Sequence, residues 1–290
     1  MSDLAASVRA RLLNIAKAQG VDFNQVLVRF ALERILYRLT RSQHADRFVL
    51  KGALLFTVWY DMPHRATRDA DLLDFGSSDP ASIALVFRDI AAVAVDDGIV
   101  FDPGSVTVEE IRKEAGYGGF RVIIAGDLAR ARCKTQIDVG FGDAVTPGPV
   151  DTVYPVLLHE MPAPRLRAYP AYTVVAEKFH AIALLGMTNS RLKDYFDLSV
   201  VLERETLDVD LLADAIKATF ERRVMAVPAE MPIGLTDEFA HDQSRRALWH
   251  AFLKKNELAF RPLPSIVDRL RVALSPALKR AVPDGHSVGN

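Results

Sequence analysis

Hydrophobic and polar residues alternate along this chain with two different periods, and the period predicts which segments are helical and which are extended. Apolar residues recur at helical spacing from Leu4 to Ile15, and Gly20 ends the helix that they predict. A second helix is expected from Asp22, which can cap it, to about Thr40. We then expect strands at 47–50, 69–75, 106–111, 120–124 and 135–141, helices at 53–60 and 81–95, and connections at 116–119 and 125–132.

The second half of the chain follows a different pattern. Residues 144–170 are rich in proline and low in periodicity, as expected of a crossover between two lobes. Beyond them, helices are expected at 172–185, 191–203, 209–222, 237–256 and 265–281. The predicted fold class is therefore α+β and bilobed. An N-terminal α/β lobe over residues 1–165, with two leading helices and a mixed sheet, precedes a helical C-terminal lobe over residues 166–290.

Charge and cysteine content narrow the kinds of partner and site. The 290 residues carry a formal net charge of -1, so any contact with nucleic acid must use local basic patches rather than bulk charge. Cys133 is the single cysteine, which excludes an intrachain disulfide and a zinc site built from cysteines. The first residues lack the apolar core of a signal peptide, and no run approaches the roughly 20 apolar residues that cross a bilayer. We therefore expect a cytoplasmic protein with no membrane partner.

The candidate chemistry begins with a pair of aspartates in the strand predicted at 69–75. Asp69 and Asp71 are two residues apart, so in a strand their side chains point to the same face. Two ionised carboxylates at that distance repel each other unless a cation neutralises them. Mg²⁺ or Mn²⁺ suits this role, because hard cations prefer oxygen ligands and bind carboxylates together with substrate phosphates. Gly52, just before the helix at 53–60, leaves backbone N–H groups open to phosphate oxygens.

A third carboxylate lies in the strand predicted at 135–141. Ile137, Val139 and Phe141 alternate there with polar or small residues, so Asp138 faces away from the core side. A neighbouring strand could bring Asp138 to the same metal, and the alternative is an edge-strand aspartate that faces water. Asp74 falls on the other face from Asp69 and Asp71, and we interpret it as structural or as a cap.

Three motifs in the sequence resemble those of one enzyme family. Lys51-Gly52-Ala53, followed by Arg68-Asp69-Ala70-Asp71-Leu72, resembles the first motif of DNA-polymerase-β-like nucleotidyltransferases, and in detail that of the AbiEii and MenT toxins. Two later stretches match the same branch: Ala176-Glu177-Lys178-Phe179-His180-Ala181 and Lys193-Asp194-Tyr195-Phe196-Asp197-Leu198. The motifs span roughly residues 49 to 198.

The resemblance implies a bilobed enzyme that uses Mg²⁺ and transfers a nucleoside monophosphate from a nucleoside triphosphate (NTP). It implies an RNA acceptor, such as the tRNA 3′ end, a consequent block of translation and growth, and a nearby AbiEi-like antitoxin gene. Asp69, Asp71 and Asp138 would then be the metal ligands, and Lys51, Gly52, Ala53 and Arg68 would bind the nucleotide. Ala53 departs from the family pattern, in which many members have Ser, Thr or a second Gly, so the hydroxyl contact to a phosphate is missing.

The two later motifs supply charged residues from the helical lobe. Lys178 lies beside an apolar helix stripe and could extend its ammonium to the triphosphate, although a surface lysine paired with a carboxylate would show the same pattern. The resemblance makes Asp194 a catalytic carboxylate and leaves Asp197 as support, whereas spacing alone also allows a surface ion pair on one helix. His180 is interpreted as a packed or capping histidine. Candidate RNA contacts are Arg65, Arg68, Arg130, Arg132, Lys134, Arg191 and Lys193, with Arg222-Arg223, Arg245-Arg246 and Lys254-Lys255 as further basic pairs.

Two other functions remain open from the sequence. A regulatory module that binds nucleotide without turnover is favoured by Ala53. A transferase whose acceptor is a protein or a small molecule is favoured by the near-neutral net charge. The preferred interpretation is a metal-dependent nucleotidyltransferase toxin acting on RNA.

Overall fold

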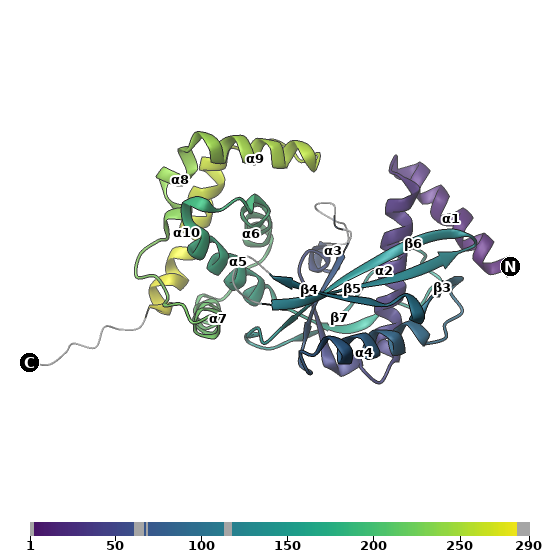
Figure 1. The fold of residues 1–290 in the computed structure, drawn as a ribbon. Helices are drawn as coiled ribbons and strands as arrows, with labels where there is room; N and C mark the ends of the chain where they lie inside the picture. The colour runs from purple at the N-terminus through teal and green to yellow at the C-terminus, as the bar shows by residue number, and fades with distance from the viewer. Residues whose placement is uncertain (1–2, 61–66, 68, 113–117, 283–290) are drawn as a thin grey trace, which may run out of the picture. The chain divides into compact units, whose positions relative to one another are not determined.

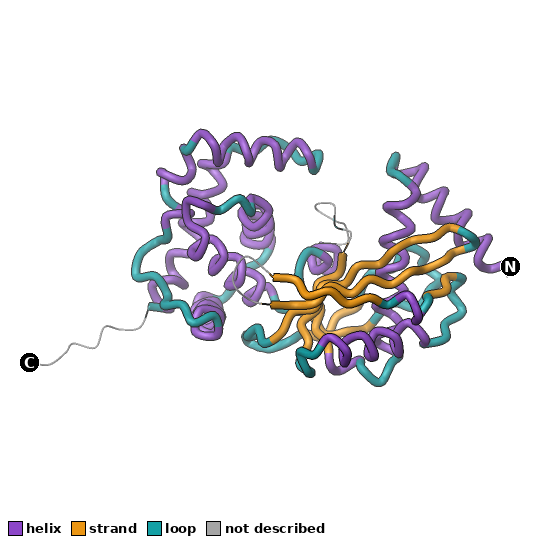
Figure 2. The backbone as a smooth tube through the Cα atoms, viewed as in Figure 1, coloured by secondary structure: helices purple, strands orange, loops and turns teal. Residues whose placement is uncertain are grey.

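The chain folds into two compact units, each described here by itself. The structure is a computed structural model that describes residues 3–60, 67, 69–112 and 118–282. The first unit comprises residues 1–142 and 150–168, and the second comprises residues 143–149 and 169–290. All the described strands belong to the first unit, and the second is built from helices (Figure 2). The expected class, α+β with a mixed-sheet lobe followed by a helical lobe, is confirmed.

The first unit combines four helices with eight strands in the described residues. The helices are α1 (Asp3–Gln19), α2 (Phe23–Arg41), α3 (Leu54–Tyr60) and α4 (Pro80–Ala92). The strands are β1 (Phe48–Lys51), β2 (Asp69–Asp74), β3 (Ile99–Phe101), β4 (Thr107–Arg112), β5 (Gly118–Leu128), β6 (Ala131–Phe141), β7 (Val150–Val153) and β8 (Arg165–Ala168). The predicted cap of the second helix is confirmed, because the Asp22 carboxylate accepts the N–H of Asn24.

The strands form one mixed sheet in the order β3-β5-β6-β2-β1-β8-β7, with β4 pairing with β5 as well. β2 and β6 pair in parallel, as do β1 and β8, and the other pairs are antiparallel. The two predicted carboxylate strands, β2 and β6, are therefore direct neighbours. A segment early in the chain and one about seventy residues later meet at this pair.

Helices α2 and α4 cover one face of the sheet (Figure 1). Phe48 of β1 packs against Phe87 of α4, with ring centroids 5.6 Å apart. On β6, Ile137 and Val139 point to this covered face and are at most 1% exposed. Burial of this apolar face supplies the main driving force for the unit, and it leaves the opposite face of β2 and β6 for polar side chains.

The long β5–β6 hairpin differs from the sequence prediction, which placed a connection at 125–132. The strands continue to Leu128 and resume at Ala131, so the turn contains only Ala129 and Arg130. These two residues have φ values of 49° and 68°, the left-handed conformation that a two-residue hairpin turn requires. Asn-Gly usually signals such a turn, and Ala-Arg gives no such signal in the sequence.

The proline-rich segment 144–170 also contains structure that was not predicted. β7 and β8 lie within it and pair at the edge of the sheet. Strand β3 was missed as well. All three are only three or four residues long, and β7 is mostly exposed, so none shows the alternation that identifies a strand in sequence.

The second unit contains six described α-helices. They are α5 (Ala171–Leu185), α6 (Leu192–Arg204), α7 (Val209–Arg222), α8 (Asp237–His241), α9 (Gln243–Lys255) and α10 (Leu263–Ala281). The helix predicted at 237–256 is wrong as a single element, because it is broken at Asp242, whose carboxylate caps α9 by accepting the N–H of Arg245. Within the described residues, no helix combines the length and apolar character needed to span a membrane.

Candidate active site

A row of charged side chains crosses the face of the sheet opposite to α2 and α4. The register places five residues directly opposite one another on successive strands: Glu109 on β4, Arg121 on β5, Asp138 on β6, Asp71 on β2 and Lys51 on β1. Directly opposed residues share one face, so their side chains are neighbours. Two carboxylates thus lie side by side at the centre of the row, with one basic residue on each side. We call these five residues the charged row.

The predicted pairing of Asp138 with the β2 aspartates is therefore present in the register. Asp71 and Asp138 are Cα partners, and Asp69 is the partner of Gln136 one step along the same face. The Gln136 amide lies 3.5 Å from Asp69 Oδ2 and donates to Asp138 Oδ1 at 3.3 Å. Thr67 donates its hydroxyl to Asp69 at 2.7 Å. Arg65 and Arg68, predicted to bind RNA or nucleotide, lie outside the described residues.

Gly52 lies against the carboxylate of Asp71. A Cβ added to Gly52 would come within 2.1 Å of Asp71 Oδ2 and 2.8 Å of Asp71 Cβ. The glycine also has a φ of +73°, which other residues adopt only with strain. The same glycine thus permits both the turn from β1 into α3 and the close approach of Asp71. Ala53 follows it, and its carbonyl accepts the N–H of Phe56 at the start of α3.

The Gly52→Ala variant should therefore lose activity because the Asp71 carboxylate is displaced, in addition to a backbone penalty of about 1–2 kcal/mol. Gly20→Ala is the matched control, since Gly20 has a φ of +66° and a Cβ there would meet nothing within 4 Å. We expect both variants to lose similar stability from backbone strain, and only Gly52→Ala to lose nucleotide transfer. Thermal unfolding and a transfer assay measure the two effects. Equal activity in the two variants would contradict the role of the Gly52–Asp71 contact.

Asp138 is held by an arginine that the sequence did not single out. Arg121 Nε and Nη2 each donate to one oxygen of Asp138 at 2.9 Å. This two-point pairing is the strongest geometry available to an arginine and a carboxylate. The hydrogen bond to Asp138 raises the pKa of the Arg121 guanidinium above its ordinary value. The period-2 pattern of β5 could have placed Arg121 on this face, but only the register shows that it opposes Asp138.

The donor set of the row suits a divalent cation. Asp69 and Asp71 present carboxylate oxygens on one face of β2, and the Asp71 carboxylate rests on the bare α-carbon of Gly52. Lys51, 7% exposed, adds a positive charge at the end of the row. In the parts of the chain that the structure describes, no three His, Cys, Asp or Glu side chains are gathered tightly enough to hold a metal ion. Asp138 is turned to Arg121 instead.

Asp74 is structural. It is 2% exposed and forms a two-point pair with Arg47, at 2.6 and 2.7 Å. It also accepts the N–H of Gly76 at 2.6 Å and so closes the turn after β2. This position on the covered side of β2 agrees with its interpretation from the alternation of the strand.

The second unit has its own buried charge cluster, formed by Lys178, Asp194 and Asp197. Lys178 Nζ donates to Asp194 at 2.9 Å and to Asp197 at 2.7 Å, and Arg191 pairs with the other oxygen of Asp194 at 2.9 Å. The Lys178 side chain is 15% exposed and both aspartates are 1% exposed. Burial acts to lower the pKa of Lys178, but the two carboxylates outweigh it and raise that pKa above its ordinary value. Asp194 and Asp197 are thus partners of Lys178 on another helix.

A second polar cluster in this unit was not predicted. Arg223, at the end of α7, contacts Asp143 and Glu177 and lies 3.3 Å from His180 Nδ1. His180 also packs against Phe220, with ring centroids 4.9 Å apart, as expected of a packed histidine. Burial, with a smaller contribution from Arg223, lowers the pKa of His180 to about 4. Arg223 was a candidate RNA contact, and the structure places its side chain, 13% exposed, in this cluster.

The remaining basic candidates fall into two groups. Arg132 and Lys134 are exposed on β6 and, being even-numbered like Asp138, share its face; Arg130 is exposed in the hairpin turn. Others are engaged by neighbours: Arg191 by Asp194, and Arg245 by the carbonyl of Asn189. At roughly 3.3 Å per residue, Lys134 and Arg132 lie about 13 and 20 Å along the strand from Asp138. We call Arg130, Arg132 and Lys134 the basic strip.

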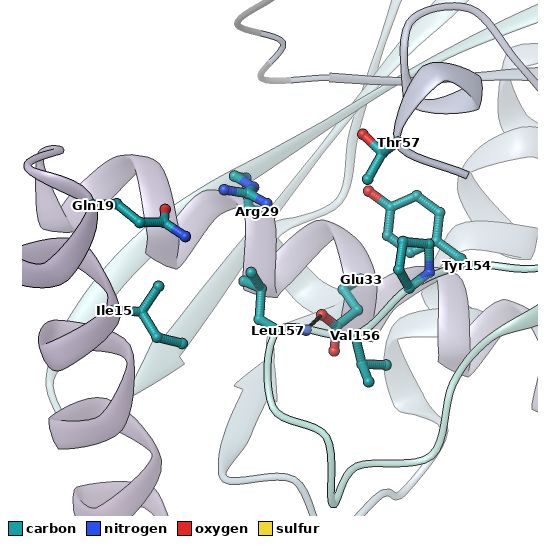
Figure 3. Close-up of a pocket in the computed structure, with 9 residues that line it drawn as sticks. Ile15, Gln19, Arg29, Glu33, Thr57, Tyr154, Val156 and Leu157 are labelled. Carbon is teal, nitrogen blue, oxygen red and sulfur yellow. Dashed lines mark hydrogen bonds between the residues drawn. The ribbon is translucent and has the colours of Figure 1, made fainter. Parts of the chain in front are cut away.

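The first unit also contains a pocket that is separate from the charged row. It has a volume of about 260 Å³ and is lined by residues of α1, α2, α3 and the segment 154–157, including Arg29, Glu33, Thr57 and Tyr154 (Figure 3). Glu33 accepts the N–H of Leu157 at 2.7 Å, and burial raises the pKa of its carboxyl to about 7. Glu33 thereby fastens the segment after β7 to α2. The pocket and the predicted site share no lining residue.

Comparison with known proteins gives one family match. The family described as "Nucleotidyl transferase AbiEii toxin, Type IV TA system" matches residues 34–276. The chain is similar to the solved structure of JHP933 from Helicobacter pylori, with 14% identity, 97% of this chain and 94% of that chain covered, and a TM-score of 0.46. It is similar to a second H. pylori structure, named as a nucleotidyltransferase, with 14% identity, 97% of each chain covered and a TM-score of 0.48. No curated protein sequence matches it.

Proposed function

The chain belongs to the AbiEii family of nucleotidyltransferase toxins from type IV toxin–antitoxin systems, and we propose that it transfers a nucleoside monophosphate from an NTP to RNA in a reaction that requires Mg²⁺ or Mn²⁺. The observation that supports this most is the charged row, in which Asp71 and Asp138 are adjacent in register and Asp69 shares their face. An antitoxin is the partner that family membership implies, and we propose an AbiEi-like protein.

The carboxylates of β2 are the proposed ligands of the cation. A bound divalent cation would neutralise phosphate charge and favour departure of pyrophosphate as the acceptor hydroxyl bonds to the α-phosphorus. Asp69 and Asp71 would hold this cation, and Gly52 leaves room for the Asp71 carboxylate. Lys51, Gly52, Ala53 and Arg68 are the proposed nucleotide contacts of the first motif. Since Ala53 has no hydroxyl, the contact at this position falls to the backbone.

The second unit contributes Lys178 and Asp194 to the proposed reaction. Lys178 keeps its positive charge although it is largely buried, because Asp194 and Asp197 lie within hydrogen-bond distance. We propose that Lys178 binds the triphosphate and that Asp194 positions the acceptor or serves as the base that takes the proton from its hydroxyl. Asp197 supports the lysine.

The reaction is tested by incubating the full-length protein with total tRNA and each α-labelled NTP in turn, with Mg²⁺ or with EDTA. We expect label on RNA with one or two of the nucleotides, and none in EDTA, because the carboxylates cannot hold the triphosphate without a cation. Label at the tRNA 3′ end would identify the acceptor. Label on protein or on a small molecule would show that the acceptor belongs to that class and is not RNA. NTP binding without any product would favour the regulatory module that binds nucleotide without turnover. Ala53→Ser would then be the first variant to test for a gain of activity.

RNA binding is expected to use the basic strip. The double change Arg132→Glu and Lys134→Glu should weaken RNA binding about tenfold or more and reduce the slope of log K against log salt by about 2, one for each phosphate contact removed. The KM for NTP should not change, because both residues lie well away from the carboxylates along β6. Filter binding of labelled tRNA at several salt concentrations measures this.

The control for that experiment is Arg88→Glu. Arg88 is exposed on α4, which packs on the opposite face of the sheet. The Arg88→Glu variant changes the net charge in the same direction and leaves the basic strip intact, so its RNA affinity should fall by less than about threefold. An equal loss in Arg88→Glu would show that bulk charge, and not this surface, determines RNA affinity.

A further inference from the structure

Arg121 occupies the place in the charged row where a cation would neutralise Asp138. Both Asp138 oxygens accept hydrogen bonds from the one guanidinium, at 2.9 Å each. The Asp138 side chain is 9% exposed and that of Arg121 is 36% exposed. The pair therefore lies at the surface of the sheet, and the arginine can leave it for solvent without disturbing the apolar face.

The charged row and Asp69 together carry a net negative charge without a metal ion. The four carboxylates of Glu109, Asp138, Asp71 and Asp69 face two basic side chains, Lys51 and Arg121, which leaves two negative charges. The two-point pair uses one acceptor site on each Asp138 oxygen, and the positive charge of the guanidinium repels a divalent cation at the same carboxylate. Arg121 and a cation therefore compete for Asp138.

We infer that Arg121 is a positioning residue that competes with the divalent cation for Asp138. This rests on the proposed function, in which Asp69 and Asp71 hold a cation. Without nucleotide, Arg121 holds Asp138 and the cation is bound by the two β2 carboxylates only, hence weakly. Asp138 becomes a ligand when Arg121 leaves it. The third carboxylate is therefore controlled by an arginine on the neighbouring strand, and the cation site is completed in two stages.

The test is a titration of the nucleotide-free protein with Mn²⁺, in which the electron paramagnetic resonance signal of the free ion measures how much is bound. Arg121→Gln should bind Mn²⁺ about fivefold or more tightly than wild type, because three carboxylates are then available. The double variant Arg121→Gln/Asp138→Asn should return to the wild-type affinity. Thermal unfolding is the second readout: Mn²⁺ should raise the midpoint of Arg121→Gln more than that of wild type. Unchanged or weaker binding in Arg121→Gln, or a gain that persists in the double variant, overturns the inference.

Three further variants separate this competition from other effects on Mn²⁺ binding. Arg132→Gln removes the same charge from the same face of the sheet, but Arg132 lies six residues along β6 from Asp138. The Mn²⁺ affinity of this variant should therefore change less than twofold. If Arg121→Gln does not fold, Arg121→Lys keeps the charge without the two-point geometry and should tighten binding about twofold; no tightening overturns the inference. Asp71→Asn tests the proposed function itself: Mn²⁺ binding that survives this change contradicts the cation site, whatever Arg121→Gln shows.

Discussion

Replacing Asp71 with Asn is expected to reduce nucleotide transfer about a thousandfold or more and to change the free energy of unfolding by no more than about 1 kcal/mol. The loss of activity follows from removing an anionic ligand: several kcal/mol of charge stabilisation disappear, and each 1.36 kcal/mol is a factor of ten in rate. Stability changes little because Asp71 directly opposes another carboxylate, Asp138, and like charges in that position are destabilising. Removing one of them offsets the loss of contacts to Asp71.

The measurements are a labelled-NTP transfer assay and urea unfolding, on Asp71→Asn and on Asp151→Asn as the matched control. Asp151 is an exposed strand aspartate on β7, in the same unit but not in the charged row. The Asp151→Asn variant should retain full transfer activity. Asp69→Ala should be inactive for the same reason as Asp71→Asn. Transfer by Asp69→Ala at the wild-type rate would remove the β2 carboxylates from the mechanism.

The shared face of Asp69, Asp71 and Asp138 was predictable because strand periodicity is simple. Side chains two apart share a face, so Asp69 and Asp71 could be paired, Asp74 set aside and Asp138 assigned to the polar side, from alternation alone. Alternation does not give register, which is set by long-range pairing. The opposition of Asp71 to Asp138, and of Asp138 to Arg121, therefore required the folded structure.

Local turn chemistry explains the other errors in the fold. The β5–β6 hairpin turns on Ala129 and Arg130, both with positive φ, where no glycine or asparagine marks the bend. The strands β7 and β8 are short and lie within a proline-rich segment, with β7 at the edge of the sheet and β8 next to it. Their place in the sheet depends on β1, which is distant in sequence. In each case tertiary pairing stabilises a conformation that local propensity does not favour.

Lys178 illustrates the same limit for helices. From spacing alone, Asp194 and Asp197 could also have formed a surface ion pair with Lys193 along their own helix. The structure instead brings Lys178 from α5 to both aspartates, which are 1% exposed. Because α5 packs against α6, these three charged residues form a buried cluster and not a surface ion pair. A substitution of Lys178 is therefore expected to affect stability as well as activity.

Replacing Lys178 with Met should abolish transfer and also destabilise the protein by about 3–5 kcal/mol. Two buried carboxylates lose the cation that compensates them, and an uncompensated buried charge is costly. Methionine retains most of the volume of the side chain, so the cost is electrostatic and not due to a cavity. Lys217→Met is the control, because Lys217 is 48% exposed and lies 3.8 Å from Asp214, an exposed pair worth at most about 1 kcal/mol.

The structural and functional roles of Lys178 are separated by also neutralising its partners. In Lys178→Met/Asp194→Asn/Asp197→Asn no buried charge lacks a partner, since Arg191 is 31% exposed and can be solvated. We expect this triple variant to recover at least half of the lost stability, measured by urea unfolding, while transfer stays at background, because the cation proposed to bind triphosphate is still missing. A triple variant as unstable as Lys178→Met would show that packing, and not charge, accounts for the loss. Recovery of transfer together with stability would make Lys178 a structural residue only.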